Sequence, residues 1–538
     1  MTGDLWTAPP RTVETLSSLS EAERYRRFDA LQARLPHVWE HMRLNHEDES
    51  VVVVPSITLD RAVAASGSLT QAYEERFLFL LMLLRQPRLR MVYVTSLPVA
   101  PEIIEYYLSL LPGVIPSHAR ARLSLVAVHD ATQRSLSEKL LERPLLLSRI
   151  AAMIPNPARS HLVPYNTTER ERDLAVSLGI PMYGADPRLA DLGSKTGCRQ
   201  LFAEVGVPHP LGKENLHSMD EVVAAVIEMR SQRPTMSSAI VKLDEGVSGA
   251  GNALVDLRGL PSPGSPTEGE AVRQRLRDMQ LESPDTPYDV YVSKFAEGGI
   301  VEERIVGSEV RSPSVLMRVR PGGAVEILST HDQMLGGASG QSYLGCVFPA
   351  DPGYARLITQ HAETIGHGLA ATGALGRFAV DFVVVREGAG WTPYAIELNL
   401  RKGGTTHPFL TLQFLTDGRY DPGTALFLTP RDHEKHLVAT DHLESDLLRG
   451  LVPSDLFDIV ARHGLQFDQS RQEGVVFHMI SSLTEHGRVG LTAVGDTPEQ
   501  AERRYRQAER VLLEEARLSL VERPLPPVDS SSRGTGDA

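Results

Sequence analysis

Short apolar runs alternate with amphipathic stretches throughout residues 1–187. Apolar runs that predict buried strands lie at residues 51–55, 91–96 and 123–128. Stretches with helical periodicity lie at residues 69–85, 101–111 and 170–178, and Gly179 ends the last of them. Because strands that alternate with helices usually form a parallel sheet, the pattern predicts a Rossmann-like α/β domain.

Residues 188–430 have a mixed pattern in which strands predominate. Strands are predicted at residues 288–295, 309–319, 325–330 and 378–385. Glycine-rich turns, such as the one at residues 320–325, favour an antiparallel sheet. Residues 257–269 are rich in Pro, Gly and Ser, which indicates either a surface loop or a functional lid.

Residues 437–528 are predicted to form a small α+β domain. We expect a helix at residues 455–463, with Ser454 as its N-cap, and a charged helix at residues 497–516. The apolar runs at residues 474–483 and 487–495 are separated by the sequence TEHG, which predicts a hairpin. Residues 529–538 are poor in apolar side chains and are expected to be a disordered tail.

Charge and cysteine content narrow the function classes. A net charge of −13 and a pI near 5.8 disfavour nucleic acid as the main partner, because a phosphate backbone requires a basic surface. Cys198 and Cys346 lie far apart without a C-x-x-C motif, so we expect reduced thiols in a cytoplasmic protein. The most apolar segment, residues 77–84, is too short for a bilayer, which requires about 20 residues. With no secretory signal either, we expect no membrane partner.

Three side chains with oxygen atoms lie on or next to predicted strands between residues 381 and 399. Glu397 and Asn399 are two residues apart, so a strand places both on one face. Asp381 lies on a neighbouring predicted strand. Carboxylate and amide oxygens are ligands that Mg²⁺ prefers, which makes this set a candidate metal site. The alternative is that these residues are the solvent-facing polar side chains of an amphipathic strand.

Two lysines and two glutamates suggest a nucleotide site. Lys242 lies in an apolar run that precedes a glycine-rich loop. The backbone amides of such a loop can approach phosphates. The alternative is that the loop is an ordinary hairpin tip. Lys195 lies in GSKT, but a P-loop requires Gly directly before Lys, so we predict that Lys195 instead opens a helix ending at Gly206. Glu302 and Glu309 can accept hydrogen bonds from adenine and ribose, or can be ordinary surface charges.

The order of these motifs resembles the ATP-grasp superfamily over residues 189–416. The resemblance implies two α+β lobes that clamp ATP between antiparallel sheets. It implies that Lys195 and Lys242 contact the nucleotide, that Glu309 binds ribose, and that Asp381, Glu397 and Asn399 hold Mg²⁺. It also implies a loop that covers the phosphates, formed by Gly246, Ser248, Gly249 and Gly251. The hinge that binds adenine would be formed by Glu302, Arg304 and Ile305.

The arginine that steadies the transferred phosphoryl group is left open. D-alanine ligases have an arginine two residues before the metal-binding aspartate, but Ala379 occupies that position here. The candidates are Arg311, Arg377 and Arg401. His331, with its neighbours Asp332 and Gln333, is a candidate for contacting substrate or deprotonating the amine; a polar turn is the alternative. His407 is a weaker candidate of the same kind.

The phrases PSITLD, VPYNTTERE and STHDQMLGG extend the resemblance to nearly the whole chain. They are similar to the peptide ligase family of pheganomycin biosynthesis. That family implies a Rossmann-like pre-ATP-grasp domain, an ATP-grasp domain and a small α+β C-terminal domain. It further implies a ligase that uses ATP and a pair of Mg²⁺ ions to join a carboxylate substrate to an amine substrate through an acyl phosphate. A homo-oligomer and a role in specialised-metabolite biosynthesis are compatible with this family. An ATP-grasp kinase and a non-catalytic ATP-binding scaffold are the alternatives.

Overall fold

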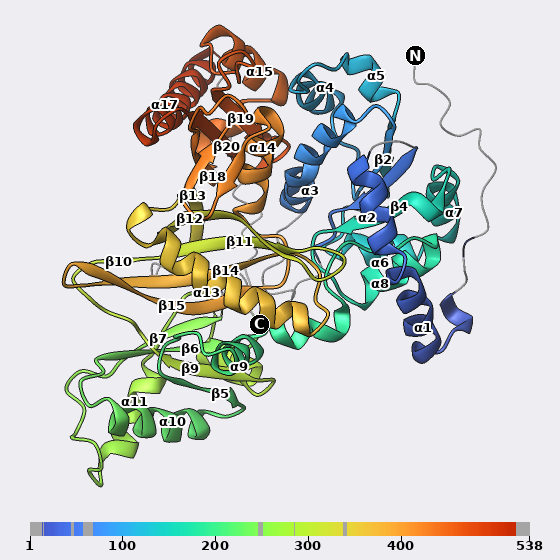
Figure 1. The fold of residues 1–538 in the computed structure, drawn as a ribbon. Coiled ribbons are helices and arrows are strands. Elements are labelled where there is room, and N and C mark those ends of the chain that lie inside the picture. Colours follow the sequence, from blue (N-terminus) through green and yellow to red (C-terminus); the bar gives the residue numbers. More distant parts are fainter. Residues whose placement is uncertain are drawn as a thin grey trace, which may run out of the picture.

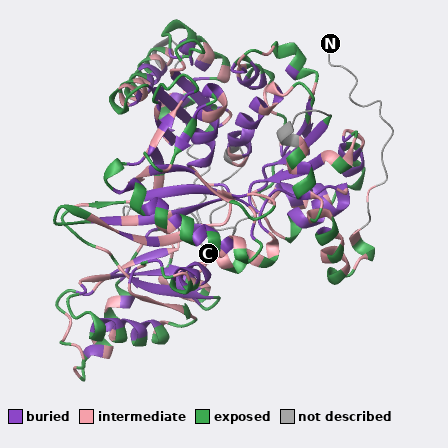
Figure 2. Cartoon of the chain, viewed as in Figure 1, coloured by how far each residue is buried: buried purple, intermediate pink, exposed green. Residues whose placement is uncertain are grey.

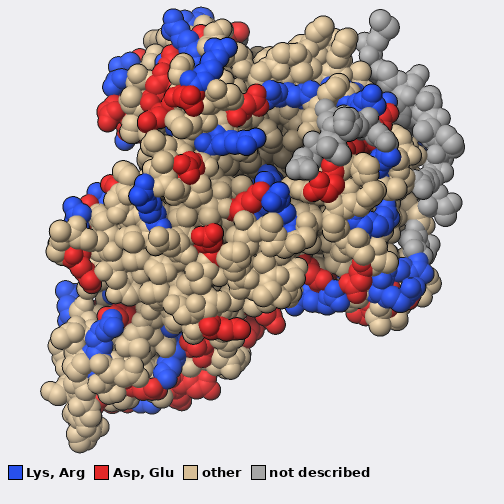
Figure 3. Space-filling view, viewed as in Figure 1, with Lys and Arg blue, Asp and Glu red and all other residues tan. Residues whose placement is uncertain are grey.

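The computed structural model describes residues 13, 16–44, 48–57, 68–245, 251–283, 286–336 and 342–522 (Figure 1). The expected disordered tail at residues 529–538 lies outside these ranges. Strands of the interior are buried, whereas the outer faces of the peripheral helices are exposed (Figure 2). On the face shown in Figure 3, acidic and basic side chains are interspersed rather than gathered by sign.

The N-terminal region contains a four-stranded parallel sheet in the order β3-β2-β1-β4, as the alternating pattern predicted. Its strands are β1 (Glu49–Val54), β2 (Leu89–Thr95), β3 (Leu123–Ala127) and β4 (Ser160–Pro164). Successive β1 side chains enter two different cores, because Val51 and Val53 pack on one face and Val52 and Val54 on the other. A strand covered on both faces has a continuous apolar run, which explains the VVVV sequence.

Helices surround this parallel sheet (Figure 1). They are α1 (Glu21–Gln32), α2 (Leu35–Leu44), α3 (Ser68–Glu75), α4 (Pro101–Ser109), α5 (Pro116–Arg120), α6 (Leu136–Leu141), α7 (Pro144–Ala152) and α8 (Glu169–Leu178). The helix predicted at residues 69–85 is divided into α3 and the 3₁₀ helix η3 (Arg76–Arg85), whose apolar side chains are buried except for the partly buried Leu83. Among the described helices, none combines the length and the apolar composition that a bilayer crossing requires.

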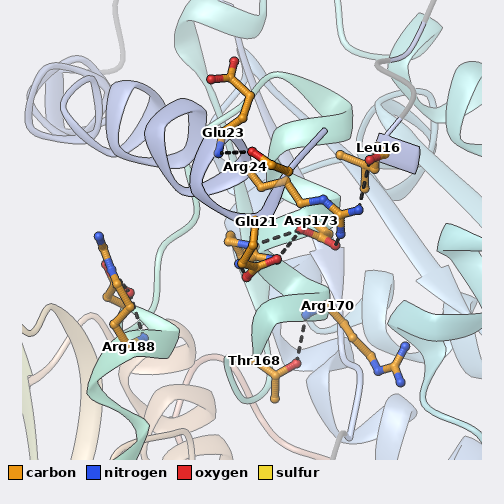
Figure 4. Close-up of polar contacts among 11 residues, drawn as sticks. Leu16, Glu21, Glu23, Arg24, Thr168, Arg170, Asp173 and Arg188 are labelled. Carbon is orange, nitrogen blue, oxygen red and sulfur yellow. Dashed lines mark hydrogen bonds and ion pairs between the residues drawn. The ribbon is translucent and has the colours of Figure 1, made fainter. Parts of the chain in front are cut away.

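Ion pairs fix α1 against α8 (Figure 4). Arg24 of α1 donates to Asp173 of α8 at 2.8 Å, and Arg172 of α8 donates to Glu21 of α1. Thr168 caps α8, since its hydroxyl accepts a hydrogen bond from the backbone of Arg170 at 3.2 Å. The Arg24–Asp173 contact joins residues 149 apart in the chain and holds α1 against α8.

A five-stranded antiparallel sheet follows, in the order β5-β9-β6-β7-β8. Its strands are β5 (Gly212–Leu216), β6 (Ser238–Leu243), β7 (Asn252–Asp256), β8 (Gln280–Leu281) and β9 (Gly299–Glu303), and the helices α10 (Met219–Gln232) and α11 (Glu268–Arg277) pack beside it. The strand predicted at residues 288–295 is wrong: this segment is helix α12 (Tyr288–Phe295). Tyr291 and Phe295, four residues apart, are both buried, which fits a helical and not a strand period.

A larger antiparallel sheet of nine strands forms the centre of the molecule (Figure 1). It contains β10 (Val310–Arg311), β11 (Pro313–Val319), β12 (Val325–Gly336), β13 (Ser342–Phe348), β14 (Gly376–Glu387), β15 (Gly390–Asn399), β18 (His436–Glu444), β19 (Gly474–His478) and β20 (Arg488–Gly495). The strand predicted at residues 309–319 is interrupted at Ser312, and its two pieces pair with β14. Helix α13 (Pro352–Ala371) covers one face.

The C-terminal strands continue this sheet, because β18 pairs with β13 and β20 pairs with β18. The remaining elements are α14 (Thr406–Thr416), β16 (Arg419–Asp421), β17 (Leu426–Leu428), η6 (Asp446–Gly450), α15 (Pro453–Arg462), α16 (Ser482–His486) and α17 (Pro498–Glu522). We retain residues 1–187, 188–430 and 437–528 as a proposed division into domains.

Two local predictions in this part are corrected. Val452, not Ser454, is the N-cap of α15, because Pro453 occupies the first helical position and Asp455 accepts a hydrogen bond from the Val452 amide at 3.0 Å. The TEHG segment is no tight hairpin turn, since it completes the short helix α16 before Gly487 adopts a left-handed conformation. Strands β19 and β20 nevertheless pair antiparallel, as predicted.

Candidate active site

The structure brings Asp381, Glu397 and Asn399 together on one face of the nine-stranded sheet. Asp381 on β14 is paired directly with Glu397 on β15. The amide of Asn399 donates to one oxygen of Asp381 at 2.8 Å, and Gln333 on β12 donates to the other at 2.7 Å. The residues expected to hold Mg²⁺ are therefore adjacent, and their role as ligands stays a prediction.

The two carboxylates influence each other's ionisation. Burial raises the pKa of Asp381 to about 6, and the negative charge of Glu397 adds to this shift. Burial also disfavours the charged form of Glu397, but the neighbouring Lys195 ammonium outweighs it and lowers the pKa of Glu397. Near neutral pH, both carboxylates are ionised, so two adjacent negative charges lie in the site and attract cations.

Lys195 supplies one of those cations from the first turn of α9 (Lys195–Glu204). Its Nζ lies 2.6 Å from Glu397 Oε1, and its side chain is almost fully buried. Ser194 is the N-cap, because its hydroxyl accepts a hydrogen bond from the amide of Gly197 at 2.9 Å. The predicted helix start at Lys195 is thus confirmed.

A second buried ion cluster centres on Glu302 in β9. Lys242 Nζ lies 2.5 Å from one oxygen of Glu302, and Arg199 Nη1 lies 3.1 Å from the other. Arg199 was missed in the sequence, although its position four residues after Lys195 places both on one side of α9. Helix α9 therefore contacts the five-stranded sheet through Arg199 and the nine-stranded sheet through Lys195.

Asp244 connects the start of α9 to the glycine-rich segment after β6. Its carboxylate accepts hydrogen bonds from the Thr196 amide at 2.8 Å and the Thr196 hydroxyl at 3.0 Å. Gly246, Ser248 and Gly249, the predicted phosphate-covering residues, lie outside the described residues. Gly251 is described and has a φ of +94°, a conformation that favours glycine.

Residues 304–309 connect the five-stranded sheet to the nine-stranded sheet, which is where a nucleotide hinge is expected. The backbone amide of Arg304 donates to the Ser238 carbonyl at 3.2 Å, and Ile305 follows it, partly buried. Glu309, the expected ribose-binding residue, is partly exposed and pairs with Arg311 at 2.9 Å. These residues stay predicted nucleotide contacts.

Among the three candidate arginines, Arg401 has a clear electrostatic effect on both carboxylates. The positive charge of Arg401 contributes to lowering the pKa of both Asp381 and Glu397. Arg377 lies four residues from Asp381, about 13 Å along the strand, and its charge interacts with Tyr183 and Arg318.

Arg311 occupies the opposite face of the sheet from Asp381. Arg311 pairs with Val384 of β14 and points to the same face as that residue. Asp381 is three residues from Val384 on the same strand, so its side chain points to the opposite face. The charge of Arg311 acts on Asp332 and Tyr354, on the side covered by α13. The geometry therefore favours Arg401 over both Arg311 and Arg377.

Strand alternation places Asp332 on the opposite face of β12 from His331 and Gln333. Gln333 reaches Asp381, whereas Asp332 accepts a hydrogen bond from Tyr354 of α13 at 2.6 Å. His331 is fully buried beside Phe348, and neither ring nitrogen has a hydrogen-bond partner among the described residues. Burial lowers the pKa of His331 to about 3, so its ring is neutral. His331 thus lies on the same face of the sheet as Asp381, but it is buried among aromatic side chains and is not on the surface of the site.

Lys402 is a further residue that sequence reasoning missed. It follows Arg401, is buried, and donates through Nζ to the carbonyl of Pro164, at the end of β4, at 2.5 Å. Burial, followed by the charge of Arg377, lowers the pKa of Lys402 to about 7. This lysine joins the N-terminal sheet to the loop that carries Arg401.

Comparisons of sequence identify related proteins. Residues 187–280 and 286–422 match the family described as "IQCH-like, ATP-grasp", and residues 455–508 match the family described as "PGM1 C-terminal domain". The chain is 30% identical over 450 residues to the L-propargylglycine–L-glutamate ligase of Streptantibioticus cattleyicolor, which covers 81% of this chain and 89% of that protein. It is 22% identical over 516 residues to IQ motif-containing protein H of Danio rerio, covering 86% of this chain and 48% of that protein.

Solved structures share the fold. The ADP complex of N5-carboxyaminoimidazole ribonucleotide synthetase superposes with a TM-score of 0.50 and 11% identity, covering 88% of this chain and 98% of that one. A nucleotide complex of biotin carboxylase from Campylobacter jejuni superposes with a TM-score of 0.50 and 14% identity, covering 88% and 95%.

Proposed function

Since the chain belongs to the ATP-grasp ligase family that includes L-propargylglycine–L-glutamate ligase, we propose that it joins the carboxylate of an amino acid or modified amino acid to the amine of an amino acid or peptide. One observation carries the proposal: Lys195, Lys242 and Arg401 all act electrostatically on Glu397, beside Asp381. Cations that face adjacent carboxylates are what an ATP phosphate chain and its metal require.

Asp381, Glu397 and Asn399 fit Mg²⁺, because they present hard oxygen donors from adjacent strands. When bound, Mg²⁺ would neutralise charge on the ATP phosphates. We propose a pair of ions, as the sequence resemblance implied. Glu397 can bind metal when Lys195 exchanges its ion pair for a phosphate oxygen.

The proposed reaction has two steps. A substrate carboxylate oxygen attacks the γ-phosphorus of ATP, the bond to the β-phosphate oxygen breaks, and ADP leaves. The substrate amine then attacks the acyl-phosphate carbonyl, loses a proton, and expels inorganic phosphate to leave an amide. Lys195, Lys242 and Arg401 stabilise charge on the phosphoryl group during the first step. The burial of Lys195 and Lys242 limits the access of water, which would hydrolyse the acyl phosphate.

The wider biological context follows from the same relationship. We propose a role in specialised-metabolite peptide biosynthesis. The cytoplasmic location and the homo-oligomer stay predictions from the sequence.

An ADP-release screen tests the proposal. Purified full-length chain is incubated with ATP, Mg²⁺ and pairs of amino acids or short peptides, and products are analysed by mass spectrometry. The expected result is ADP and phosphate released together with a condensed product that has lost one water. Lys242→Ala serves as the inactive control. A stable phosphorylated product without an amide would instead identify a kinase.

A further inference from the structure

A compact cluster of two histidines and one aspartate lies outside the nucleotide site. It is formed by His407 on α14, Asp441 on β18 and His478 on β19. All three side chains are at most 5% exposed. Within the described residues, this is the one group of three or more such side chains whose ligand atoms converge closely enough to share an ion.

The convergence is unusual for hydrogen bonding alone. His407 Nε2 and His478 Nε2 are 3.0 Å apart, His478 Nε2 and Asp441 Oδ1 are 2.8 Å apart, and His407 Nε2 and Asp441 Oδ1 are 3.3 Å apart. A neutral imidazole carries one proton, so a triangle of two ring nitrogens and one carboxylate oxygen cannot satisfy its three edges with separate linear hydrogen bonds. A single cation at the centre would satisfy all three lone pairs at once.

The edges match a metal site. Tetrahedral bonds of about 2.0–2.1 Å place ligand atoms roughly 3.3 Å apart. The separations of 2.8, 3.0 and 3.3 Å equal this value or are slightly shorter. Two nitrogen donors and one oxygen disfavour Mg²⁺ and Ca²⁺, which take oxygen ligands, and favour a borderline ion such as Zn²⁺.

The surroundings hold the aspartate in place for such an ion. Arg76 donates to the other oxygen, Asp441 Oδ2, at 2.8 Å, and Arg488 donates to the backbone carbonyl of Asp441 at 2.7 Å. Only Oδ1 therefore faces the histidines. Outer hydrogen bonds of this kind orient metal ligands, although the arginine charge reduces the negative charge that attracts the ion.

We propose that His407, Asp441 and His478 bind one Zn²⁺ ion, with a fourth position open to water. The ion would join three segments separated by 34 to 71 residues. His407 lies six residues after Arg401, so the ion would also anchor the far end of the loop that begins at the nucleotide site. We infer a structural role in holding α14 against the C-terminal strands.

Metal analysis of the untagged, full-length chain tests this site. The protein is dialysed against a chelator, incubated with ZnCl₂ in excess Mg²⁺, desalted, and analysed by mass spectrometry for metals. About one Zn²⁺ per chain is expected for a single structural site. His407→Gln and His478→Gln should each retain far less zinc, whereas His442→Gln, beside Asp441, should retain the wild-type amount.

A second measurement avoids dependence on the variants. Titration of Co²⁺ into the wild-type apoprotein should produce visible absorption bands of a four-coordinate ion, saturating near one equivalent, and zinc should raise the melting temperature. Absence of stoichiometric zinc, cobalt bands and a thermal shift in the wild-type protein would overturn the proposal. Equal zinc content in His407→Gln and the wild type would also overturn it.

Discussion

Lys195 Nζ lies 2.6 Å from Glu397 Oε1 and joins the start of α9 to the end of β15. Lys195 is buried and Glu397 is partly buried, and each shifts the pKa of the other toward the charged form. Breaking such a pair leaves an uncompensated charge, so this contact holds α9 against the nine-stranded sheet.

Glu397→Gln should remove ADP release while preserving the fold. The amide keeps the shape of the side chain but removes the charge that faces Lys195 and the metal. We expect at least a 100-fold loss of substrate-dependent ADP release, as for the loss of a charge-stabilising group in other enzymes (roughly 10²–10³). Glu387→Gln at the exposed end of β14 is the matched control. Comparable activity in both variants would contradict the site.

Arg401→Ala should be far more damaging than Arg311→Ala. Arg401 acts on Asp381 and Glu397, whereas Arg311 lies on the α13 side of the sheet and pairs with Glu309. We expect kcat to fall by about two orders of magnitude for Arg401→Ala, in the range seen when one transition-state contact is lost. The measurement is steady-state ADP release at saturating ATP. A larger loss for Arg311→Ala would assign the phosphoryl contact to that residue.

Gly197→Ala should destabilise the protein and weaken ATP binding. A Cβ at residue 197 would lie 1.9 Å from the carbonyl oxygen of Asp191, so α9 must shift to accommodate it. Overpacking of this kind costs about 1–3 kcal/mol. Gly390→Ala, which meets only the Glu387 carbonyl at 3.9 Å, is the control. In Gly197→Ala, the melting temperature should fall and the KM for ATP should rise. Unchanged values in this variant would show that α9 is not fixed at this contact.

Glu75→Gln should stabilise the protein at alkaline pH. Burial raises the pKa of Glu75 to about 8 from an ordinary value of 4.5. Between these values the folded chain holds a proton that the unfolded chain has lost, so the wild-type stability falls as pH rises from 4.5 to 8. Glutamine does not titrate and can still accept the hydrogen bond from the Ser481 amide.

The stability difference between Glu75→Gln and wild type should therefore widen through this window and level off above a pH of about 8. A gap on the order of a few kcal/mol is expected at its upper end. Urea unfolding at about pH 5 and 7, within the window, and at about pH 9, above it, measures the difference. A difference that does not change with pH would show that Glu75 is not buried in its protonated form.

Local patterns in the chain are sufficient to predict several features of the site. The two-residue period of a strand places Glu397 and Asn399 on one face, and the Ser194 cap places Lys195 at the start of a helix. These features depend on a few adjacent residues, so the sequence alone determines them. The alternating apolar runs likewise predict the parallel N-terminal sheet.

Other features depend on contacts between distant segments. The segment Tyr288–Phe295 is a helix although its sequence predicts a strand, because short apolar runs satisfy both periods until packing selects one. The choice of Arg401 over Arg311 depends on which side of a sheet each strand presents. That side is set by register and not by spacing in the chain.

The sequence by itself determined most of the strand and helix types around the candidate site, whereas its assignment of residues to phosphate and Mg²⁺ stays a prediction. Tertiary structure alone decided the pairing of Arg199 with Glu302, the burial of His331 and the meeting of His407, Asp441 and His478. The physical reason is that local periodicity orients neighbouring side chains, whereas ion pairs and metal ligands require atoms from distant segments to approach within about 3 Å.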